Sequence, residues 1–288
     1  MANIGVLGAS SLVGRCVLAQ LAKSNNQVYA FSRSTEESIN ENIQWIRINP
    51  ELKQTKQLSI THWICLAPIW IVADYLPMLE SYNAQRVLAL SSTSAISKQD
   101  TSEPLETITV NRLQLGEQQL QQWAGKQDIE WLILRPTLIY GFGEDKNIAE
   151  ITRFIQRFNF FPLLGSATGL RMPVHTEDVA SACIEAMKKA NIANHIYNIS
   201  GAETLTYRQM VERIFIALGK RAHFIRIPLT AFKLALFCLR VLPRYQHWSS
   251  AMAERMNKDL VFDHSEASRN FGYTPRPFEL SSQDITIK

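Results

Sequence analysis

Short apolar runs alternate with longer stretches of helical spacing from the first residues of the chain onward. Each run is apolar throughout, which is typical of strands that are covered on both faces. Strands separated by helices form right-handed βαβ units and a parallel sheet. The pattern predicts strands at 3–7, 27–31, 43–48, 61–67, 86–92 and 129–136, and helices at 11–23, near 70–82 and at 105–124.

The pattern is less regular after about residue 140. It predicts a strand end running into a helix over 173–190, a strand at 195–200, a helix from Thr206 through Leu218, a short strand at 224–228 and helical runs to about 258. We therefore predict an α/β fold with a Rossmann-type doubly wound parallel sheet and a small α/β C-terminal lobe. The predicted boundaries are 1–165 for the dinucleotide-binding domain, to which 173–200 returns, and 201–288 for a substrate or partner lobe.

Composition narrows the classes of protein that the chain can represent. Its 288 residues are 46% hydrophobic and 19% charged, enough to bury a core, and the net charge of +4 is too low for a nucleic-acid surface. The four cysteines lie far apart in apolar runs, so no metal site is predicted and free thiols in a reducing compartment are expected. The N-terminus lacks the basic region and long apolar core of a signal peptide, which favours a cytoplasmic location.

A phosphate-binding loop is predicted where the first strand meets the first helix, in "GVLGASSLVGR". Gly8 permits a tight turn, Gly14 permits close helix–strand packing, and the helix N-terminus presents N–H groups to a pyrophosphate. Gly8, Ser11 and Gly14 have the spacing G-x-x-G-x-x-G, and Ser11 stands where the middle glycine is expected; its side chain adds bulk and could donate a hydrogen bond. The alternative is an ordinary tight turn. The predicted cofactor contacts in this loop are Gly8, Ser10, Ser11, Leu12 and Val13.

The second predicted strand ends in Ser32-Arg33, where an NAD-preferring site places an acidic residue on the ribose hydroxyls. Arginine can stack on adenine and pair with a 2′-phosphate. Arg33 therefore favours NADP(H) over NAD(H), with a solvated loop arginine as the alternative.

The chain resembles the extended and atypical short-chain dehydrogenase/reductases of the NAD-dependent epimerase/dehydratase superfamily over nearly its whole length. No single match is decisive, but the matches occur in the family's order. The matching segments are "GASSLVG", "INP", "CLAP", "LSSTSA", "LRPTLIYG", "PVHTEDVA", "YNISGAETLTYRQM" and "FDHSEASRNFGYTPRPF".

The resemblance implies further roles. Asn49 would take the place of an aspartate that touches adenine, and Thr93 would be the catalytic Ser/Thr of strand five. The implied cofactor contacts beyond the phosphate loop are Asn49, Ala67, Pro68, Ser91 and Pro136.

The same resemblance implies a catalytic tyrosine and, four residues later, a lysine that lowers its pKa. In the family a glutamate commonly follows that lysine by four residues. Aligned on Glu117, the lysine position holds Leu113 and the tyrosine position holds Thr109; a shift by one residue gives Ile108 and Arg112. No tyrosine in the chain has a lysine four residues later. The sequence thus predicts a cofactor fold whose usual acid/base is impaired or replaced.

Other residues could supply the chemistry. Tyr140 lies at the end of the sixth predicted strand and could offer a phenol, although packing or lining a pocket is the simpler role. His175 is expected to brace a strand–helix junction, and Arg171 could meet a substrate phosphate or lie on the surface.

The segment 220–258 contains eight lysines and arginines and one acidic residue, interleaved with apolar side chains. Its stretch 229–244 could contact an anionic membrane or a protein, cap a pocket for a nucleotide-diphosphate ligand, or form a core helix whose basic side chains reach solvent.

We therefore expect an atypical NADP(H)-binding member of this superfamily, cytoplasmic or peripheral at the inner membrane face. It would act in binding, sensing or assembly, or run a slow reduction with other residues. The alternative is an active nucleotide-sugar epimerase, dehydratase or reductase that uses Thr93 and Tyr140.

Overall fold

The computed structural model describes residues 3–34, 40–48, 58–97, 104–228, 231 and 255–286. They form two compact units, the first from Met1–Thr137, Thr176–Ile199 and Asp263–Thr274, the second from Leu138–His175, Ser200–Phe262 and Pro275–Lys288. The chain thus leaves the first unit after Thr137, earlier than the predicted boundary at 165, and returns to it twice. Most of the helical runs predicted between 229 and 254 lie outside the described residues.

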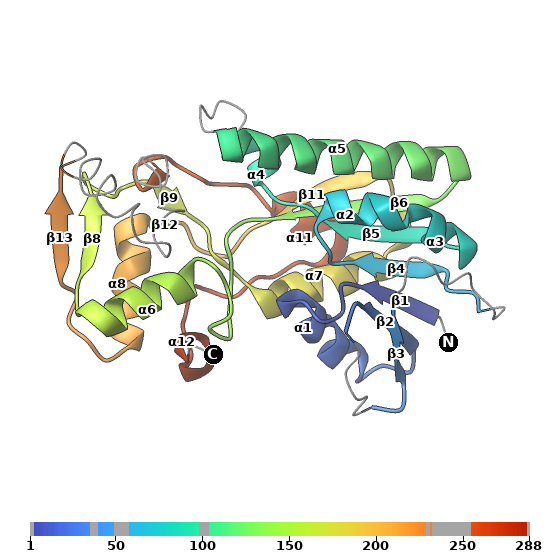
Figure 1. Cartoon of the computed structure of the whole chain (residues 1–288), viewed down its shortest axis with the longest axis horizontal. Helices are drawn as coiled ribbons and strands as arrows, with labels where there is room; N and C mark the ends of the chain where they lie inside the picture. The colour runs from blue at the N-terminus through green and yellow to red at the C-terminus, as the bar shows by residue number, and fades with distance from the viewer. Residues whose placement is uncertain are drawn as a thin grey trace. The chain divides into compact units, whose positions relative to one another are not determined.

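The first unit is built on a parallel sheet of seven strands in the order β11-β6-β5-β4-β1-β2-β3 (Figure 1). Strand order 3-2-1-4-5-6 is that of the doubly wound dinucleotide-binding fold, so the predicted fold class is confirmed. The strands are β1 (Asn3–Leu7), β2 (Gln27–Ser32), β3 (Ile43–Arg47), β4 (His62–Cys65), β5 (Arg86–Leu90), β6 (Glu130–Pro136) and β11 (His195–Ile199).

Helices cover both faces of this sheet, with α5, α2 and α3 on one side and α1 and α7 on the other (Figure 1). The near-continuous apolar sequence of the strands follows from this double cover. The helices are α1 (Leu12–Leu21), α2 (Ile69–Val72), α3 (Leu76–Ser81), α4 (Ser94–Ser97), α5 (Pro104–Gln127), α7 (Thr176–Lys188) and α11 (Ser265–Phe271), with short 3₁₀ turns η1 (Ala73–Tyr75) and η2 (Ala190–Ile192).

Three aromatic rings form the centre of the core on the α5 side of the sheet. Trp63 is fully buried and its ring lies 4.9 Å from that of Phe31 and 5.4 Å from that of Tyr82. A Cβ on Gly5 would lie 2.5 Å from the Trp63 ring, so the indole fills the space that a side chain at this position of β1 would occupy. The indole N–H donates to the carbonyl of Ile60, which satisfies its polar edge.

The second unit packs two longer helices against short strand pairs. Its helices are α6 (Ile148–Phe158), α8 (Tyr207–Ala217) and α12 (Ser282–Ile285); β7 (Ile139–Tyr140) pairs with β10 (Val174–His175), β9 (Leu170–Arg171) with β12 (Leu205–Thr206), and β8 (Phe161–Leu164) with β13 (Phe224–Ile227). Thr206 caps α8 through a reciprocal capping box with Gln209, as expected for the predicted helix start. The core between α6, α8 and β8 includes the buried side chains of Phe215, Met210 and Leu163.

Helix α5 approaches α2 so closely that one position must be glycine. A Cβ on Gly116 would lie 2.8 Å from the backbone nitrogen of Trp70 and 2.9 Å from the carbonyl carbon of Ile69. Gly125, in the last turns of the same helix, has no atom within 4 Å of the corresponding Cβ position. Gly116 therefore has no room for a side chain, whereas Gly125, on the same helix, has room for one.

We expect Gly116→Ala to lower the free energy of unfolding by about 1–3 kcal/mol, because overpacking pushes α5 away from α2. Gly125→Ala, the matched control, should raise it by up to about 1 kcal/mol through helix propensity. Urea unfolding of both variants measures the two effects, and equal shifts in the two variants would contradict the close packing.

Candidate functional site

The loop between β1 and α1 requires glycine at two positions for different reasons. Gly8 has φ +83°, in the left-handed region, and a Cβ there would lie 2.6 Å from the backbone nitrogen of Ala67. A Cβ on Gly14 would lie 2.4 Å from the carbonyl oxygen of Ala9, so α1 presses directly on the turn before it. The loop therefore presents backbone rather than side chains at the carboxyl end of β1.

Ser11 is the N-cap of α1, and its hydroxyl accepts a hydrogen bond from the N–H of Gly14 at 3.0 Å. The side chain turns back onto the helix, which accounts for serine at a place where glycine was expected. Within the described residues, the N–H groups of Leu12 and Val13 in the first turn have no hydrogen-bond acceptor. These donors are free to bind an anion at the helix N-terminus.

The end of β2 carries hydroxyl groups instead of a carboxylate. Ser32, the last residue of β2, is buried, and its hydroxyl lies 2.8 Å from that of Ser10 in the phosphate loop. Arg33 follows and is exposed, whereas the guanidinium of Arg15 donates to the Ser10 carbonyl at 3.2 Å. Arg15 and Arg33 thus place two positive charges near the loop and the end of β2.

The other predicted cofactor contacts of the first unit lie at the carboxyl ends of neighbouring strands. Ala67 and Pro68 follow β4, and Pro68 is the N-cap of α2. Ser91 follows β5, and Pro136 ends β6. Parallel strands bring these ends to one edge of the sheet, where ligands bind in such folds. Asn49, the predicted adenine contact, lies outside the described residues.

Thr93, the candidate catalytic hydroxyl, is buried beside β6. Its N–H and its hydroxyl both donate to the carbonyl of Pro136, at 3.1 and 3.3 Å. The residue is 6% exposed. The hydroxyl therefore already has an acceptor within the protein.

Glu117 is a buried carboxylate that joins α5 to two strand ends. Its side chain accepts from the Ser91 hydroxyl at 2.5 Å and from Arg135 Nε at 2.9 Å, and a second oxygen pairs with Arg135 Nη2. The fork of Arg135, on β6, thereby holds the carboxylate bidentately. The sequence analysis used Glu117 only to align the helix. The available signal for its partner was the arginine of "LRP" at 134–136, on the strand that follows the helix.

The positions four and eight residues before Glu117 on α5 carry no acidic or basic side chain. Leu113 is 4% exposed and belongs to the core of the first unit. Thr109, one turn earlier, is half-buried. A hydrocarbon and an alcohol therefore stand where the resemblance implies a lysine and a tyrosine.

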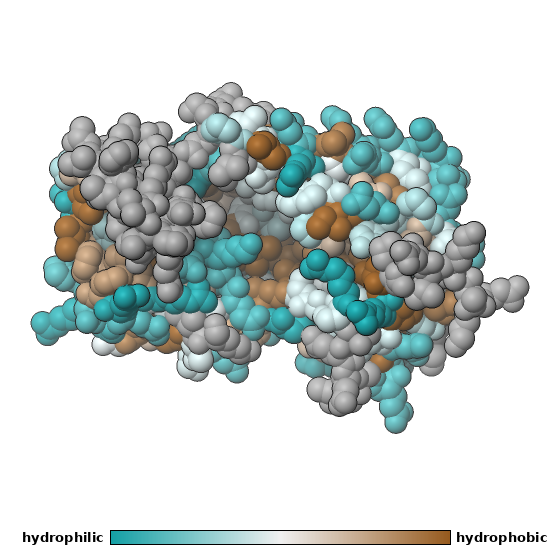
Figure 2. All heavy atoms as spheres, in the orientation of Figure 1, coloured by the Kyte–Doolittle hydropathy of each residue, from teal (hydrophilic) through white to brown (hydrophobic). Residues whose placement is uncertain are grey.

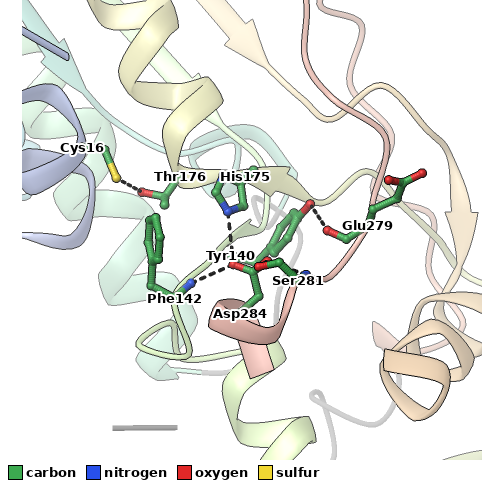
Figure 3. Close-up of polar contacts among 8 residues, drawn as sticks. All are labelled: Cys16, Tyr140, Phe142, His175, Thr176, Glu279, Ser281 and Asp284. Carbon is green, nitrogen blue, oxygen red and sulfur yellow. Dashed lines mark hydrogen bonds and ion pairs between the residues drawn. The ribbon is translucent and has the colours of Figure 1, made fainter. Parts of the chain in front are cut away.

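Tyr140 belongs to a closed cluster of the second unit (Figure 3). The phenol has no exposed surface, and its hydroxyl donates to the carbonyl of Glu279 at 3.4 Å. Its ring lies edge-on to Phe278 at 4.8 Å and to His175 at 5.1 Å between centroids. The packing is that of a core aromatic residue.

Asp284, on the short helix α12, connects this cluster to a strained turn (Figure 3). Its carboxylate accepts from the N–H of Phe142 at 2.9 Å, lies 3.2 Å from His175 Nε2, and caps its own helix through Ser281. Phe142 has φ +55°, an unfavourable conformation for a bulky residue, and sits between two glycines with positive φ. Sequence reasoning missed Asp284, although "SSQD" carries a capping-box signal.

Burial alone would raise the pKa of the Asp284 carboxyl, but hydrogen bonds from His175, Ser281 and the Phe142 N–H hold it well below its ordinary value. The ionised form is therefore the one that the folded protein contains at neutral pH. His175 braces α12 as well as the junction predicted for it.

Arg171 is neither a surface residue nor open to a substrate phosphate. It is 4% exposed, and its guanidinium donates to the carbonyls of Leu170 and Lys258 at 2.7 Å each, and to that of Arg255. Its charge also lies over the ring of Tyr207, 5.6 Å from the centroid. Both candidate roles for this arginine are replaced by a bracing role inside the second unit.

The described residues offer few groups for redox or metal chemistry. Burial raises the pKa of the Cys65 and Cys183 thiols far above the ordinary value, which disfavours the reactive thiolate. Across the part of the chain that the structure describes, no group of three or more histidine, cysteine or acidic side chains could hold a metal ion. The helices of that part are also too short or too polar to cross a bilayer.

Comparisons with known proteins place this geometry in a family. The profile of the NAD dependent epimerase/dehydratase family matches residues 69–200. UDP-glucose 4-epimerase of Vibrio cholerae is 24% identical over 162 residues, covering 56% of this chain and 46% of that protein. Subunit 9 of the NADH dehydrogenase 1 alpha subcomplex of Arabidopsis thaliana mitochondria is 26% identical over 100 residues, covering 34% and 25%. The chain spans less than half the length of the curated relatives it matches.

Among solved structures, UDP-glucuronic acid 4-epimerase from Bacillus cereus in complex with NAD has a TM-score of 0.72 at 17% identity, with 98% of this chain and 95% of that chain covered. These matches support the NAD-dependent epimerase/dehydratase superfamily for this chain. The superfamily predicted from the sequence is thus confirmed. The loss of the catalytic tyrosine and lysine at the aligned positions stays a prediction.

We expect Asp284→Asn to lower the free energy of unfolding by about 1.5–3 kcal/mol at neutral pH, because hydrogen bonds to a charged acceptor are lost. The folded-state pKa of Asp284 is depressed, so its contribution is complete above the unfolded value of about 3.9 and declines as the pH falls below it.

Urea unfolding of wild type and Asp284→Asn between about pH 7 and pH 3 measures this change. Glu279→Gln removes an exposed carboxylate from the same segment and serves as the control. A difference between wild type and Asp284→Asn that stays constant down to pH 3 would refute the ionised carboxylate.

Proposed function

We propose that this protein binds NADP(H) without the tyrosine–lysine acid/base chemistry of its superfamily, and acts as a binding, sensing or assembly module. The observation that carries the proposal is the register of α5. Gly116 contacts the backbone of α2 and Glu117 pairs with Arg135, so α5 cannot slide along the sheet. This register supports the alignment that puts Thr109 and Leu113 at the two catalytic positions.

The phosphate loop fits a dinucleotide. Side chains are absent at Gly8 and Gly14, where a Cβ would meet backbone atoms, and the N–H groups of Leu12 and Val13 are free for an anion. The superfamily's cofactor is a nicotinamide dinucleotide, which supplies hydride chemistry when bound. The remaining contacts that we propose are the ones predicted from the sequence: Ser10, Ser11, Arg33, Asn49, Ala67, Pro68, Ser91 and Pro136.

The end of β2 supports NADP(H) over NAD(H). An NAD site uses an acidic residue to accept hydrogen bonds from the ribose 2′- and 3′-hydroxyls. In this chain the place is taken by Ser32, whose hydroxyl is engaged with Ser10, and by the exposed cation Arg33. A 2′-phosphate there meets no repelling carboxylate and gains a guanidinium partner.

The second candidate is an active epimerase, dehydratase or reductase that acts on a nucleotide sugar through Thr93 and Tyr140. Family membership favours it, and so do the UDP-sugar names of several relatives. Both hydroxyls, however, are buried and donate to backbone carbonyls. Proton transfer to a substrate would first require each of these bonds to break, and so we favour the first candidate.

A nucleotide-diphosphate ligand remains compatible with both candidates. The NADH dehydrogenase subunit among the relatives gives a precedent for assembly, within the limits of its short matched stretch. We place the protein in the cytoplasm or at the inner face of the membrane. The stretch 229–244, predicted to make a membrane or protein contact, lies outside the described residues.

We expect Arg33→Ala to weaken NADPH binding at least about tenfold while leaving NADH binding within about twofold, because only the 2′-phosphate contact is lost. Titration calorimetry with both dinucleotides measures this. Lys126→Ala removes an exposed charge near the end of α5 and should change neither affinity. Failure of wild type to bind either dinucleotide would refute the cofactor proposal itself.

We expect wild type to produce neither epimerised sugar nor reduced cofactor from UDP-glucose or UDP-glucuronic acid, because loss of acid/base catalysis costs about 10²–10⁴ in rate and the lysine is also missing. The double variant Thr109→Tyr/Leu113→Lys should gain measurable conversion. Thr109→Phe/Leu113→Met, of similar bulk, is the control. Wild-type turnover in the ordinary enzyme range of about 1–10³ s⁻¹ would favour the second candidate.

A further inference from the structure

Aromatic side chains gather at the C-terminal end of α6 in the second unit. The rings of Phe154 and Phe158 lie 4.7 Å apart, Phe158 and Phe160 lie 6.2 Å apart, and Phe160 lies 6.4 Å from His223, which precedes β13. The helix ends in a left-handed cap at Asn159, and this turn carries the rings from the helix to strand β8. The cluster is thus continuous from α6 to β13.

Basic residues surround these rings. Lys220, after α8, donates to Asn159 Oδ1 at 2.5 Å, which ties the turn before Arg221 to the cap of α6. The guanidinium of Arg157 lies over the Phe158 ring at 5.3 Å, and Arg226 projects from β13. Segments 153–160 and 214–228 together contain five lysines and arginines and no acidic residue. Among the described residues, Arg157, Arg221 and Arg226 form no ion pair.

Large apolar side chains are exposed among these charges. Ile216 at the end of α8 is 68% exposed, and Phe158 and Ile225 are each 39% exposed. Figure 2 shows hydrophobic side chains over β8 and β13 at the edge of this unit, with hydrophilic ones beside them. The C-terminal ends of α6 and α8 and the strand β13 contribute Arg157, Phe158, Phe160, Ile216, Arg221, His223, Ile225 and Arg226, with Ile225 and Arg226 on opposite sides of β13. We call this region the aromatic–basic face.

We propose that the aromatic–basic face docks on an anionic lipid surface. Uncompensated arginines are attracted to acidic headgroups, while exposed phenylalanine and isoleucine side chains gain by entering the boundary between headgroups and acyl chains. Single-stranded nucleic acid would use the cations and the aromatic rings. It offers nothing to Ile216 and Ile225, which have no ring to stack on a base. A lipid surface is the ligand that would contact both the basic and the apolar side chains of the face.

The test is co-sedimentation of the full chain with vesicles of phosphatidylcholine alone or mixed with phosphatidylglycerol. We expect binding to the anionic vesicles at low salt and its loss near about 1 M salt, where the Debye length is about 3 Å. Arg157→Gln/Arg221→Gln/Arg226→Gln should weaken that binding about a hundredfold. Phe158→Ser tests the apolar half and should weaken that binding severalfold at each salt concentration at which wild type still binds.

The control removes the same number of exposed charges outside the face, through Lys23→Gln/Lys126→Gln/Lys189→Gln. Dinucleotide affinity of each variant reports that its first unit is folded, and circular dichroism reports on the whole chain. Absence of vesicle binding in wild type, equal loss in the two triple variants, or unchanged binding in the Arg157 triple variant would each overturn the proposal. Retention of wild type by single-stranded DNA without vesicle binding would overturn it as well.

Discussion

The carboxylate of Glu117 is buried in the first unit, and the position of helix α5 depends on how its charge is neutralised. Arg135 on β6 holds it with two donors, and Ser91 at the end of β5 adds a third. Leaving such a charge unpaired costs about 3–5 kcal/mol, so alternative registers of α5 are strongly disfavoured. Gly116, one residue before, lets the helix approach α2 to backbone distance at this same level. Charge pairing and close packing thus fix one point of α5, and the rest of the helix follows from it.

Cofactor binding and acid/base catalysis, the two properties expected of the superfamily, depend on different parts of the first unit. The phosphate loop keeps its glycines, its capped helix and its free N–H groups, all of which are backbone features. The resemblance places catalysis instead on two side chains of α5, and the alignment on Glu117 predicts Thr109 and Leu113 at those two positions.

In the second unit, polar side chains of types that suggest chemistry take part in packing. Tyr140, His175 and Arg171 are residue types that suggest chemistry, yet each is buried and bound to a partner in its own unit. Asp284 holds the turn at Phe142 in its left-handed conformation, and Arg171 gathers three carbonyl groups. These contacts hold together short strand pairs that would have little stability by themselves.

The sequence alone determined the order and type of most elements of the first unit, because apolar runs and helical spacing reflect local burial; β1 was predicted to the residue, and α8 of the second unit within one residue at either end. It did not predict helix α6 (Ile148–Phe158) or strand β8 (Phe161–Leu164). It also determined the glycine-rich turn after β1 and the absence of any Tyr-x-x-x-Lys from the sequence, since glycine spacing and residue identity are local properties. Only the tertiary structure decided that Glu117 pairs with Arg135, that Ser11 caps its helix, that Asp284 reaches Phe142, and that the chain leaves the first unit after Thr137. Each of these depends on which distant segments meet, and that is set by packing the whole chain rather than by any local pattern.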